Sequence, residues 1–305
     1  MEKGESIVVT GALGYSGRYA TRLLLERGHT VRTLTNHPDR ANPFGDKLAI
    51  HPYNFDRPDK LAESLRGAST LINTYWVRFP YGGATYDGAV RNTETLVDAA
   101  GRAGIRRIVQ VSIANPSLDS PLAYYKGKAR LEEIVKASGI SHAIARPTAI
   151  FGAEDVLINN IAWFVRRFPV FAVPGDGQYR MRPIYVEDMA RLLVDSAFET
   201  ENKTVDAVGP EQYTFNDLIH LIAATIGRKT TVLHMPPALA YLATSVAGGL
   251  VGDVVLTWEE CLGLLADLLG SDAPAAGPTK LSDWLKTNRS RVGTQYASEV
   301  ARHFS

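Results

Sequence analysis

The sequence predicts an α/β fold: a doubly wound parallel sheet over roughly the first half of the chain, followed by a smaller mixed α/β lobe. Two observations lead to this prediction. Up to about residue 145, short β-branched segments alternate with segments of helical periodicity, which is typical of parallel strands joined by crossover helices. After about residue 151 the regular alternation stops, as expected where a second lobe begins.

Six segments of the first half have the composition of buried strands. Ser6–Thr10 is Ser-Ile-Val-Val-Thr and stops at a glycine, as a buried parallel strand does. Thr30–Thr35 follows with alternating apolar and polar residues. The other four strands are expected at residues 47–52, 69–75, 107–113 and 141–145.

The segments between these strands have the apolar spacing of helices. Leu23, Leu24 and Leu25 give residues 17–27 an apolar face, and Gly28 ends this helix. Further helices are expected at residues 58–66, 86–103 and 122–137. Right-handed crossovers through such helices cover both faces of a parallel sheet.

The second half mixes its elements less regularly. Helices are expected at residues 159–168, 185–198 and 213–226, strands at 205–208 and 230–235, and a helical turn at 281–284. Thr214 or Asn216 is the expected N-cap of the third helix. We therefore place one domain at residues 1–150 and a smaller lobe at residues 151–305, interleaved with the first and not independent of it.

Charge and cysteine content exclude several classes of protein. The 33 basic and 32 acidic residues give a net charge of +1 without a basic run, so we expect no nucleic-acid partner. The one cysteine, Cys261, excludes an internal disulfide, and no signal peptide precedes the first strand. We therefore expect a cytoplasmic protein. The seven histidines lack HxH or HExxH spacing, so no metal site is predicted.

One uncharged segment, from Met235 to Gly252, is barely long enough to cross a bilayer. Pro236, Pro237 and three glycines interrupt it. We expect a buried helix or the apolar wall of a substrate pocket there. Membrane association is the less favoured alternative for this segment. The oligomeric state is left open, with a homodimer as one option.

A glycine-rich turn lies between the first predicted strand and the first predicted helix. Glycine lets the backbone turn sharply and approach a ligand closely, while N–H groups at the helix start and the helix dipole attract a pyrophosphate. This context predicts a dinucleotide-binding Rossmann fold in residues 1–150. The expected contacts are Thr10, Gly11, Gly14, Tyr15, Ser16 and Gly17.

The end of the second strand bears on the choice of dinucleotide. A fold of this kind reads the ribose about twenty residues downstream of the turn, with an acid for NAD or a basic group for NADP. The strand ends in Thr35-Asn36-His37, where no acid stands, and Arg18 follows the last glycine of the turn. Asn36, His37 or Arg18 is expected to contact a 2′-phosphate. NADP(H) is therefore favoured over NAD(H).

Tyr124 and Lys128 are four residues apart on a predicted helix and so share one face. An ammonium group beside a phenol favours the phenolate and lowers the pKa of the tyrosine. Tyr124 is then suited to exchange a proton with a carbonyl or alcohol oxygen during hydride transfer. The neighbouring acids Glu132 and Glu133 cannot share a helix face, and we expect both to be solvated.

Together these motifs resemble the short-chain dehydrogenase/reductase superfamily. The GxxGxxG spacing after Thr10 and the YxxxK pair resemble its extended and atypical branches. An RPxxxxG segment runs from Arg146 to Gly152. Residues 179–188, Tyr-Arg-x-x-Pro-Ile-Tyr-Val-Glu-Asp, are most similar to the branch of the 39-kilodalton complex I subunit, and NmrA-like proteins are also similar.

The resemblance implies roles for further residues. Ser112 would orient the substrate oxygen, with Ser117 and Asn115 as rivals for this role, and Lys128 would also bind the nicotinamide ribose. Asn54 stands where relatives carry aspartate. The remaining implied contacts are Asn54 and Phe55 at the adenine, Thr74 and Tyr75 along the ribose and nicotinamide path, Pro147 and Thr148 against the nicotinamide, and a structural Asn92.

Three functions remain open at this point. The first is an NADP-dependent oxidoreductase acting on a carbonyl or alcohol through Tyr124, Lys128 and Ser112. The second is an NAD(P)H-binding sensor or assembly protein without turnover, which the complex I branch suggests. The third is a nucleotide-sugar epimerase, in which Arg180 or Arg182 would bind a diphosphate; surface or inter-lobe ion pairs are the alternative role for these arginines.

Overall fold

A seven-stranded sheet forms the centre of the fold in the computed structural model, which describes residues 4–303. The strand order is β11-β6-β5-β4-β1-β2-β3, and all pairings from β3 to β6 are parallel. The α/β class and the doubly wound parallel sheet are thereby confirmed. The strands are β1 (Ser6–Thr10), β2 (Thr30–Thr35), β3 (Leu48–Pro52), β4 (Thr70–Asn73), β5 (Arg107–Val111), β6 (Ser141–Pro147) and β11 (Lys203–Ala207).

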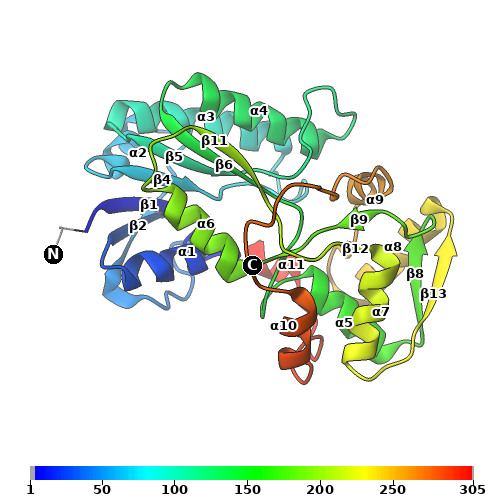
Figure 1. Cartoon of the computed structure of the whole chain (residues 1–305). Helices are drawn as coiled ribbons and strands as arrows, with labels where there is room; N and C mark the ends of the chain where they lie inside the picture. The colour runs from blue at the N-terminus through cyan, green and yellow to red at the C-terminus, as the bar shows by residue number, and fades with distance from the viewer. Residues whose placement is uncertain (1–3, 304–305) are drawn as a thin grey trace. The chain divides into compact units, whose positions relative to one another are not determined.

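Helices cover both faces of this sheet. On one face lie α1 and α6, and on the other lie α2, α3 and α4 (Figure 1). Their bounds are α1 (Tyr15–Glu26), α2 (Pro58–Leu65), α3 (Tyr86–Ala103), α4 (Ala123–Ala137) and α6 (Val186–Ser196). A short 3₁₀ turn, η1 (Gly45–Lys47), precedes β3.

The sheet and helices enclose a continuous apolar core. Val8, Leu71 and Ile108 from three adjacent strands pack with Leu61 of α2 and Leu96 of α3, and all five are fully buried. Burial of such a side chain stabilises the fold by about 1.5–3 kcal/mol. The β-branched and leucine-rich segments of the sequence therefore become the two sides of one core.

The chain forms two compact units. The first contains the chain up to Arg146 together with Val186–Val205, and the second contains Pro147–Tyr185 together with the chain from Asp206 onward. Three strand pairs belong to the second unit: β10 with β7, β12 with β9, and β13 with β8. The strands are β7 (Ile150–Phe151), β8 (Val170–Pro174), β9 (Arg180–Met181), β10 (Ile184–Tyr185), β12 (Tyr213–Thr214) and β13 (Thr231–Met235).

The helices of the second unit surround a core of their own. Phe151, Met181, Leu218 and Leu285 are among its buried residues. The helices are α5 (Leu157–Arg167), α7 (Phe215–Thr225), α8 (Pro237–Val251), α9 (Trp258–Leu265), α10 (Leu281–Asn288) and α11 (Glu299–His303). Thr214, one of the two expected caps, is the N-cap of α7, because its side chain accepts the N–H of Asp217.

The uncharged segment forms helix α8, but the expectation that it is buried is wrong. Only Ala240 and Gly248 of this helix are buried, whereas Leu242 is 60% and Leu250 is 83% exposed. Within residues 4–303 no helix has both the length and the apolar character needed to cross a bilayer. Its apolar composition therefore reflects an exposed surface and not a core.

Candidate functional site

The glycine-rich turn has a backbone that only glycine can follow. Gly11 has a φ of 66°, and its N–H donates to the carbonyl of Leu34, while the N–H of Gly14 donates to the carbonyl of Gly11. A Cβ at Gly17 would lie 2.3 Å from the carbonyl oxygen of Gly11. The turn is therefore closed tightly against the first helix, as a phosphate loop requires.

The start of α1 fits an anion. The helix begins at Tyr15, directly after Gly14, and no side-chain oxygen caps it. Its first turn also contains no acidic residue. The first N–H groups of a helix have no partner within the helix, and the dipole gives this end a partial positive charge. The residues present therefore fit the diphosphate of a dinucleotide.

A buried hydrogen-bond network connects the strand ends below this turn. The Thr10 hydroxyl donates to Oδ1 of Asn73 at 2.8 Å and accepts the backbone N–H groups of Thr74 and Tyr75. The Thr74 hydroxyl donates back to the carbonyl of Thr10, and Asn73 donates to Gln110 on β5. Thr10 thus joins β1 to β4. Asn73 and Gln110 were not predicted as site residues; Asn73 is the last residue of β4, and Gln110 is a buried polar residue within β5.

The end of β2 carries the predicted contacts for the ribose. The hydroxyl of Thr35 accepts the N–H of His37 at 3.0 Å, and Asn36 is exposed. The guanidinium of Arg32 donates to the carbonyls of Ser64 and Arg66, so it satisfies acceptors at the C-terminal end of α2. Asn36, His37 and Arg18 remain the predicted groups for a 2′-phosphate.

Three aromatic rings gather at the ends of β3 and β4. The ring of Tyr53 stacks on that of Phe55 with centroids 4.8 Å apart, and Tyr75 lies 5.0 Å from Tyr53 and 5.2 Å from Phe55. Asn92 donates to the Tyr75 hydroxyl at 2.8 Å, which gives it the expected structural contact. Asn54 has a φ of 49°, a conformation in which asparagine is favoured. Aspartate tolerates the same conformation, so the backbone does not explain the departure from aspartate.

Trp76, just after β4, brings the predicted catalytic pair together. The ring of Tyr124 meets that of Trp76 edge-on at 5.9 Å, and Nζ of Lys128 lies 4.7 Å from the centroid of the same ring. A Cβ at Gly127 would lie 2.8 Å from Trp76. Glycine between the two residues therefore allows the indole to lie directly against α4.

Lys128 is buried, with only 3% of its surface exposed. Its ammonium donates to the carbonyl of Val111 at 3.2 Å. Burial lowers the pKa of Lys128 to about 7, although the negative charge of Glu132 acts to raise it. Lys128 is therefore able to gain and lose a proton near neutral pH.

Glu132 is not solvated as expected; only 2% of it is exposed. The hydroxyl of Ser112 donates to Oε1 of Glu132 at 2.6 Å, and Arg146 binds both carboxylate oxygens at 2.8 and 2.6 Å. Burial acts to raise the pKa of Glu132, but the hydrogen bonds from Arg146 and Ser112 outweigh it and lower the pKa. The signal in the sequence was its position four residues after Lys128, on the same helix face.

This bond matters for the predicted role of Ser112. A hydroxyl has one proton to donate, and that of Ser112 is used by Glu132. Tyr124 and Lys128 share a neighbour, Trp76, whereas Ser112 is held by a buried carboxylate. The role of Ser112 toward a substrate oxygen stays a prediction.

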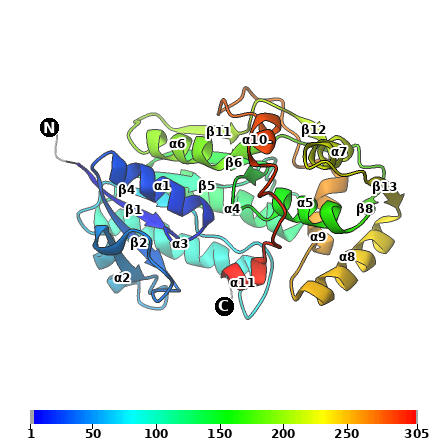
Figure 2. The same ribbon diagram turned by 90° about the horizontal axis from the view of Figure 1, so that it is seen from below.

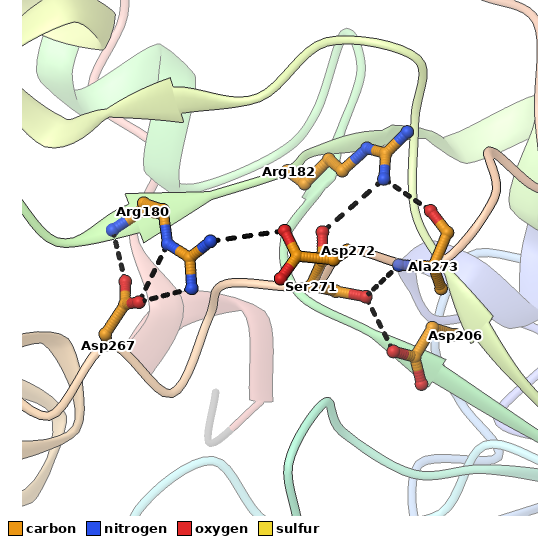
Figure 3. Close-up of polar contacts among 7 residues, drawn as sticks. All are labelled: Arg180, Arg182, Asp206, Asp267, Ser271, Asp272 and Ala273. Carbon is orange, nitrogen blue, oxygen red and sulfur yellow. Dashed lines mark hydrogen bonds and ion pairs between the residues drawn. The ribbon is translucent and has the colours of Figure 1, made fainter.

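The remaining predicted residues lie in the second unit. The hydroxyl of Thr148, which follows Pro147, donates to the carbonyl of Arg182 at 2.7 Å. Arg180 forms ion pairs with Asp267 and Asp272, as Figure 3 shows. Arg182 donates to three backbone carbonyls, those of Gly209, Ser271 and Ala273.

The ion-pair role is therefore the one observed for Arg180, whereas Arg182 braces the backbone around it. In the described part of the chain, no three or more His, Cys, Asp or Glu side chains form a group that could hold a metal ion.

Comparison with known proteins identifies the family. Residues 11–199 match a family described as NAD(P)H-binding. The chain belongs to this family. The resemblance to the extended, epimerase-like short-chain dehydrogenases/reductases is thus confirmed, and NAD(P)H is the cofactor class of the family.

Relatives with curated names differ in what they do. The chain is 25% identical to subunit 9 of the NADH dehydrogenase 1 alpha subcomplex from Arabidopsis thaliana, over 87% of this chain and 70% of that protein. It is 29% identical to a ceramide reductase from Caulobacter vibrioides, over 75% of this chain and 73% of that protein. A photosystem II assembly factor from Cyanophora paradoxa is 26% identical, over 79% and 75%.

Solved structures support the fold. A nucleoside-diphosphate-sugar epimerase from Staphylococcus aureus superposes with a TM-score of 0.75 at 16% identity, covering 92% of this chain and 99% of that one. A triphenylmethane reductase from Citrobacter sp., complexed with NADP(H), superposes with a TM-score of 0.72 at 17% identity and with the same coverage. At this identity the likeness shows the fold alone.

Proposed function

We propose that this protein is an NADP(H)-dependent oxidoreductase that reduces a carbonyl or oxidises an alcohol. The observation that carries the proposal is the arrangement of Tyr124 and Lys128 around the ring of Trp76. This arrangement lies in the same unit as a glycine turn that fits a diphosphate. A phenol and a desolvated amine on one helix face are suited to proton transfer.

Each of the two side chains has a distinct part in this mechanism. When bound, a nicotinamide dinucleotide supplies or accepts the hydride. In the direction of reduction, Tyr124 gives its proton to the substrate oxygen, which becomes a hydroxyl, and the phenolate is left behind. Protonated Lys128 stabilises that phenolate by its positive charge. The carbonyl of Val111 holds the amine in place.

The test is turnover by Tyr124→Phe. Removing the phenolic proton is expected to lower kcat by roughly 100-fold or more, measured as NADPH oxidation against a panel of aldehydes and ketones. Binding of NADPH, followed by fluorescence titration, is expected to stay within about twofold because the phenol is not part of the diphosphate site.

Tyr125→Phe is the matched control. Tyr125 is the neighbouring residue and has alanine, not lysine, four residues later. It should keep its turnover. Full activity of Tyr124→Phe on a substrate that the wild type turns over would refute the mechanism.

A preference for NADP(H) is part of the proposal. It is supported by the absence of an acid at the end of β2, where Asn36 is exposed and the hydroxyl of Thr35 accepts from His37. Arg18 on the first turn of α1 adds a positive charge. A carboxylate in this region would accept a hydrogen bond from the 2′-hydroxyl of NAD and would repel the 2′-phosphate of NADP.

A binding protein without turnover is the second candidate. One observation favours it: the proton of the Ser112 hydroxyl is already used by Glu132, so the substrate oxygen would lack this donor. It predicts that NADPH binds but that no hydride exchange is detected with any carbonyl. Exchange of labelled hydride with a single substrate would exclude it.

The epimerase candidate has less support. Arg180 pairs with two aspartates and Arg182 donates to three carbonyls, so both have uses besides a diphosphate. Calorimetric binding of UDP-glucose would revive this candidate.

A homodimer and a cytoplasmic location stay part of the proposed NADP(H)-dependent oxidoreductase.

A further inference from the structure

Exposed apolar residues are concentrated on one part of the second unit. Among the described residues, twelve large apolar side chains are exposed, and nine of them lie between Phe168 and Trp258 in that unit. A scattered exposed leucine is ordinary, whereas a group of this kind marks an interaction site. These nine residues belong to the segment around β8, to β13, to α8 and to α9.

Helix α8 supplies an apolar face. Leu239, Leu242, Val246 and Leu250 are spaced by three and four residues, so they follow one stripe along the helix. All four are more than half exposed. The helix contains no charged residue, so no charged side chain hydrates its exposed side.

The two-stranded ribbon of β8 and β13 continues this surface. Phe171 and Val232 are paired and pack against the core of the second unit. Because successive side chains of a strand point to opposite faces, Val170 and Leu233 project from the other face, and both are exposed. Helix α8 packs against β8 beside this ribbon (Figures 1 and 2).

A group of basic residues lies at the beginning of the ribbon. Arg167, Arg228 and Lys229 are exposed, and the N–H of Thr231 donates to the carbonyl of Pro169, which brings the two strand starts together. Burial is the largest cause that lowers the pKa of Arg166, and the positive charges of Arg228 and Arg167 lower it further. These three arginines are therefore near one another. Among residues 4–303 no carboxylate forms an ion pair with Arg167, Arg228 or Lys229, and the guanidinium of Arg167 donates to the backbone carbonyls of Trp163 and Thr294. We call these three residues the basic rim.

We infer that α8 and the β8–β13 ribbon bind the surface of an anionic lipid bilayer. The exposed apolar stripe of α8, whose opposite side packs against β8, is suited to the acyl boundary, and the basic rim is suited to anionic head groups. A helix of 15 residues is about 22 Å long, shorter than the hydrocarbon core of about 30 Å. Since one side of α8 also packs against β8, the inference places the helix along the membrane surface and not across the bilayer.

This inference does not depend on the proposed function, because no residue of the surface belongs to the candidate site. Charge selects the occupant. A second copy of the chain carries the same positive rim, so a dimer through this surface would gain no charge complementarity from it. An anionic bilayer satisfies both the apolar face and the rim.

Sedimentation of the full chain with lipid vesicles tests the inference. The protein is expected to sediment with vesicles of 70% phosphatidylcholine and 30% phosphatidylglycerol, and at least fivefold less with phosphatidylcholine alone. The double variant Leu242→Ser/Leu250→Ser should lose at least fivefold of the bound fraction. Arg228→Glu should remove the preference for the anionic vesicles.

Matched controls keep the test specific. Leu118 is 48% exposed in the first unit, and Leu118→Ser should bind vesicles as the wild type does. Far-ultraviolet circular dichroism and NADPH titration should show all variants folded. No sedimentation with either vesicle would overturn the inference, as would equal binding by the double variant. Self-association that the double variant abolishes, without vesicle binding, would assign the surface to a second copy.

Discussion

At the scale of single residues, the candidate site depends on charges that the fold buries. Glu132 holds Ser112 of the β5 end and Arg146 of β6 against α4, and Lys128 lies one turn earlier on the same helix. Removing a buried carboxylate leaves its donors without a partner and destabilises the fold, whereas removing a buried amine with one acceptor relieves a desolvation cost. We therefore expect replacement of Glu132 to lower the free energy of unfolding and replacement of Lys128 to raise it.

Glu132→Gln is expected to destabilise the protein by roughly 2 kcal/mol, because it leaves the Arg146 guanidinium without its counter-charge. Since the pKa of Glu132 is lowered in the folded state, its contribution is present above the ordinary value of 4.5 and is lost as the pH falls through the folded value. Urea unfolding at several pH values measures both effects. Glu133→Gln, at an exposed neighbour, should stay within about 0.5 kcal/mol.

Lys128→Met is expected to stabilise the protein while it abolishes turnover. The folded amine has a pKa of about 7 against an ordinary value of 10.5, so between these values only the unfolded chain takes up the proton. The gain should be largest below pH 7 and should shrink as the pH rises toward 10.5. Urea unfolding at pH 6.5 and pH 10 measures it. Lys126→Met, at an exposed position, should show no such dependence; an unstable Lys128→Met would contradict the assignment.

At the scale of elements, local pattern predicted most boundaries, and the exceptions have physical causes. Helix α3 has the predicted limits because Thr85 caps its start and Gly104 adopts the left-handed conformation at its end. The strand expected at residues 69–75 stops at Asn73, since the N–H groups of Thr74 and Tyr75 go to the Thr10 hydroxyl. That partner is 64 residues away, so no local pattern reveals it.

Helix α9 was missed although its signal was present. Thr257 and Glu260 form a capping box, in which each side chain accepts the backbone N–H of the other. The motif is readable from the sequence.

Gly17→Ala tests the close packing of α1 on the turn. An added methyl group would meet the Gly11 carbonyl at 2.3 Å, so the helix must move away and NADPH affinity is expected to fall more than tenfold, or about 1.4 kcal/mol. Fluorescence titration measures the affinity. Gly101→Ala in α3 adds the same group 3.9 Å from Ile140 and should leave affinity unchanged. Equal affinity of both variants would show that the turn does not hold the ligand.

At the scale of the whole molecule, the alternation of strand and helix segments indicated the fold class correctly but could not say which surface is covered. Alternating strands and helices are encoded locally, so the parallel sheet was predictable. Ion pairs such as Arg180 with Asp267 join residues 87 apart, and their choice depends on the completed fold. The same holds for α8: its hydropathy was visible in the sequence, but its exposure was not.

Cofactor binding should stabilise the whole chain, because only the folded state has the site. At a free concentration of 100 times the Kd, NADPH is expected to add about 2.7 kcal/mol to the unfolding free energy. Thermal unfolding with NADPH and with NADH at equal concentrations measures the difference between them. A larger increase in Tm with NADPH supports the proposed preference, and a larger increase with NADH would reverse it.

The hydrogen bonds at Thr10 couple the glycine turn to the residues around Tyr124 and Lys128. Three hydrogen bonds join Thr10 to Thr74 and Tyr75, and the next residue is Trp76, whose ring covers the amine of Lys128. A ligand that shifts the strand end at Thr10 must either break these bonds or carry the indole with it. A ligand bound at the glycine turn would thereby change how well Trp76 shields the Lys128 amine from water, and with it the affinity of that amine for its proton.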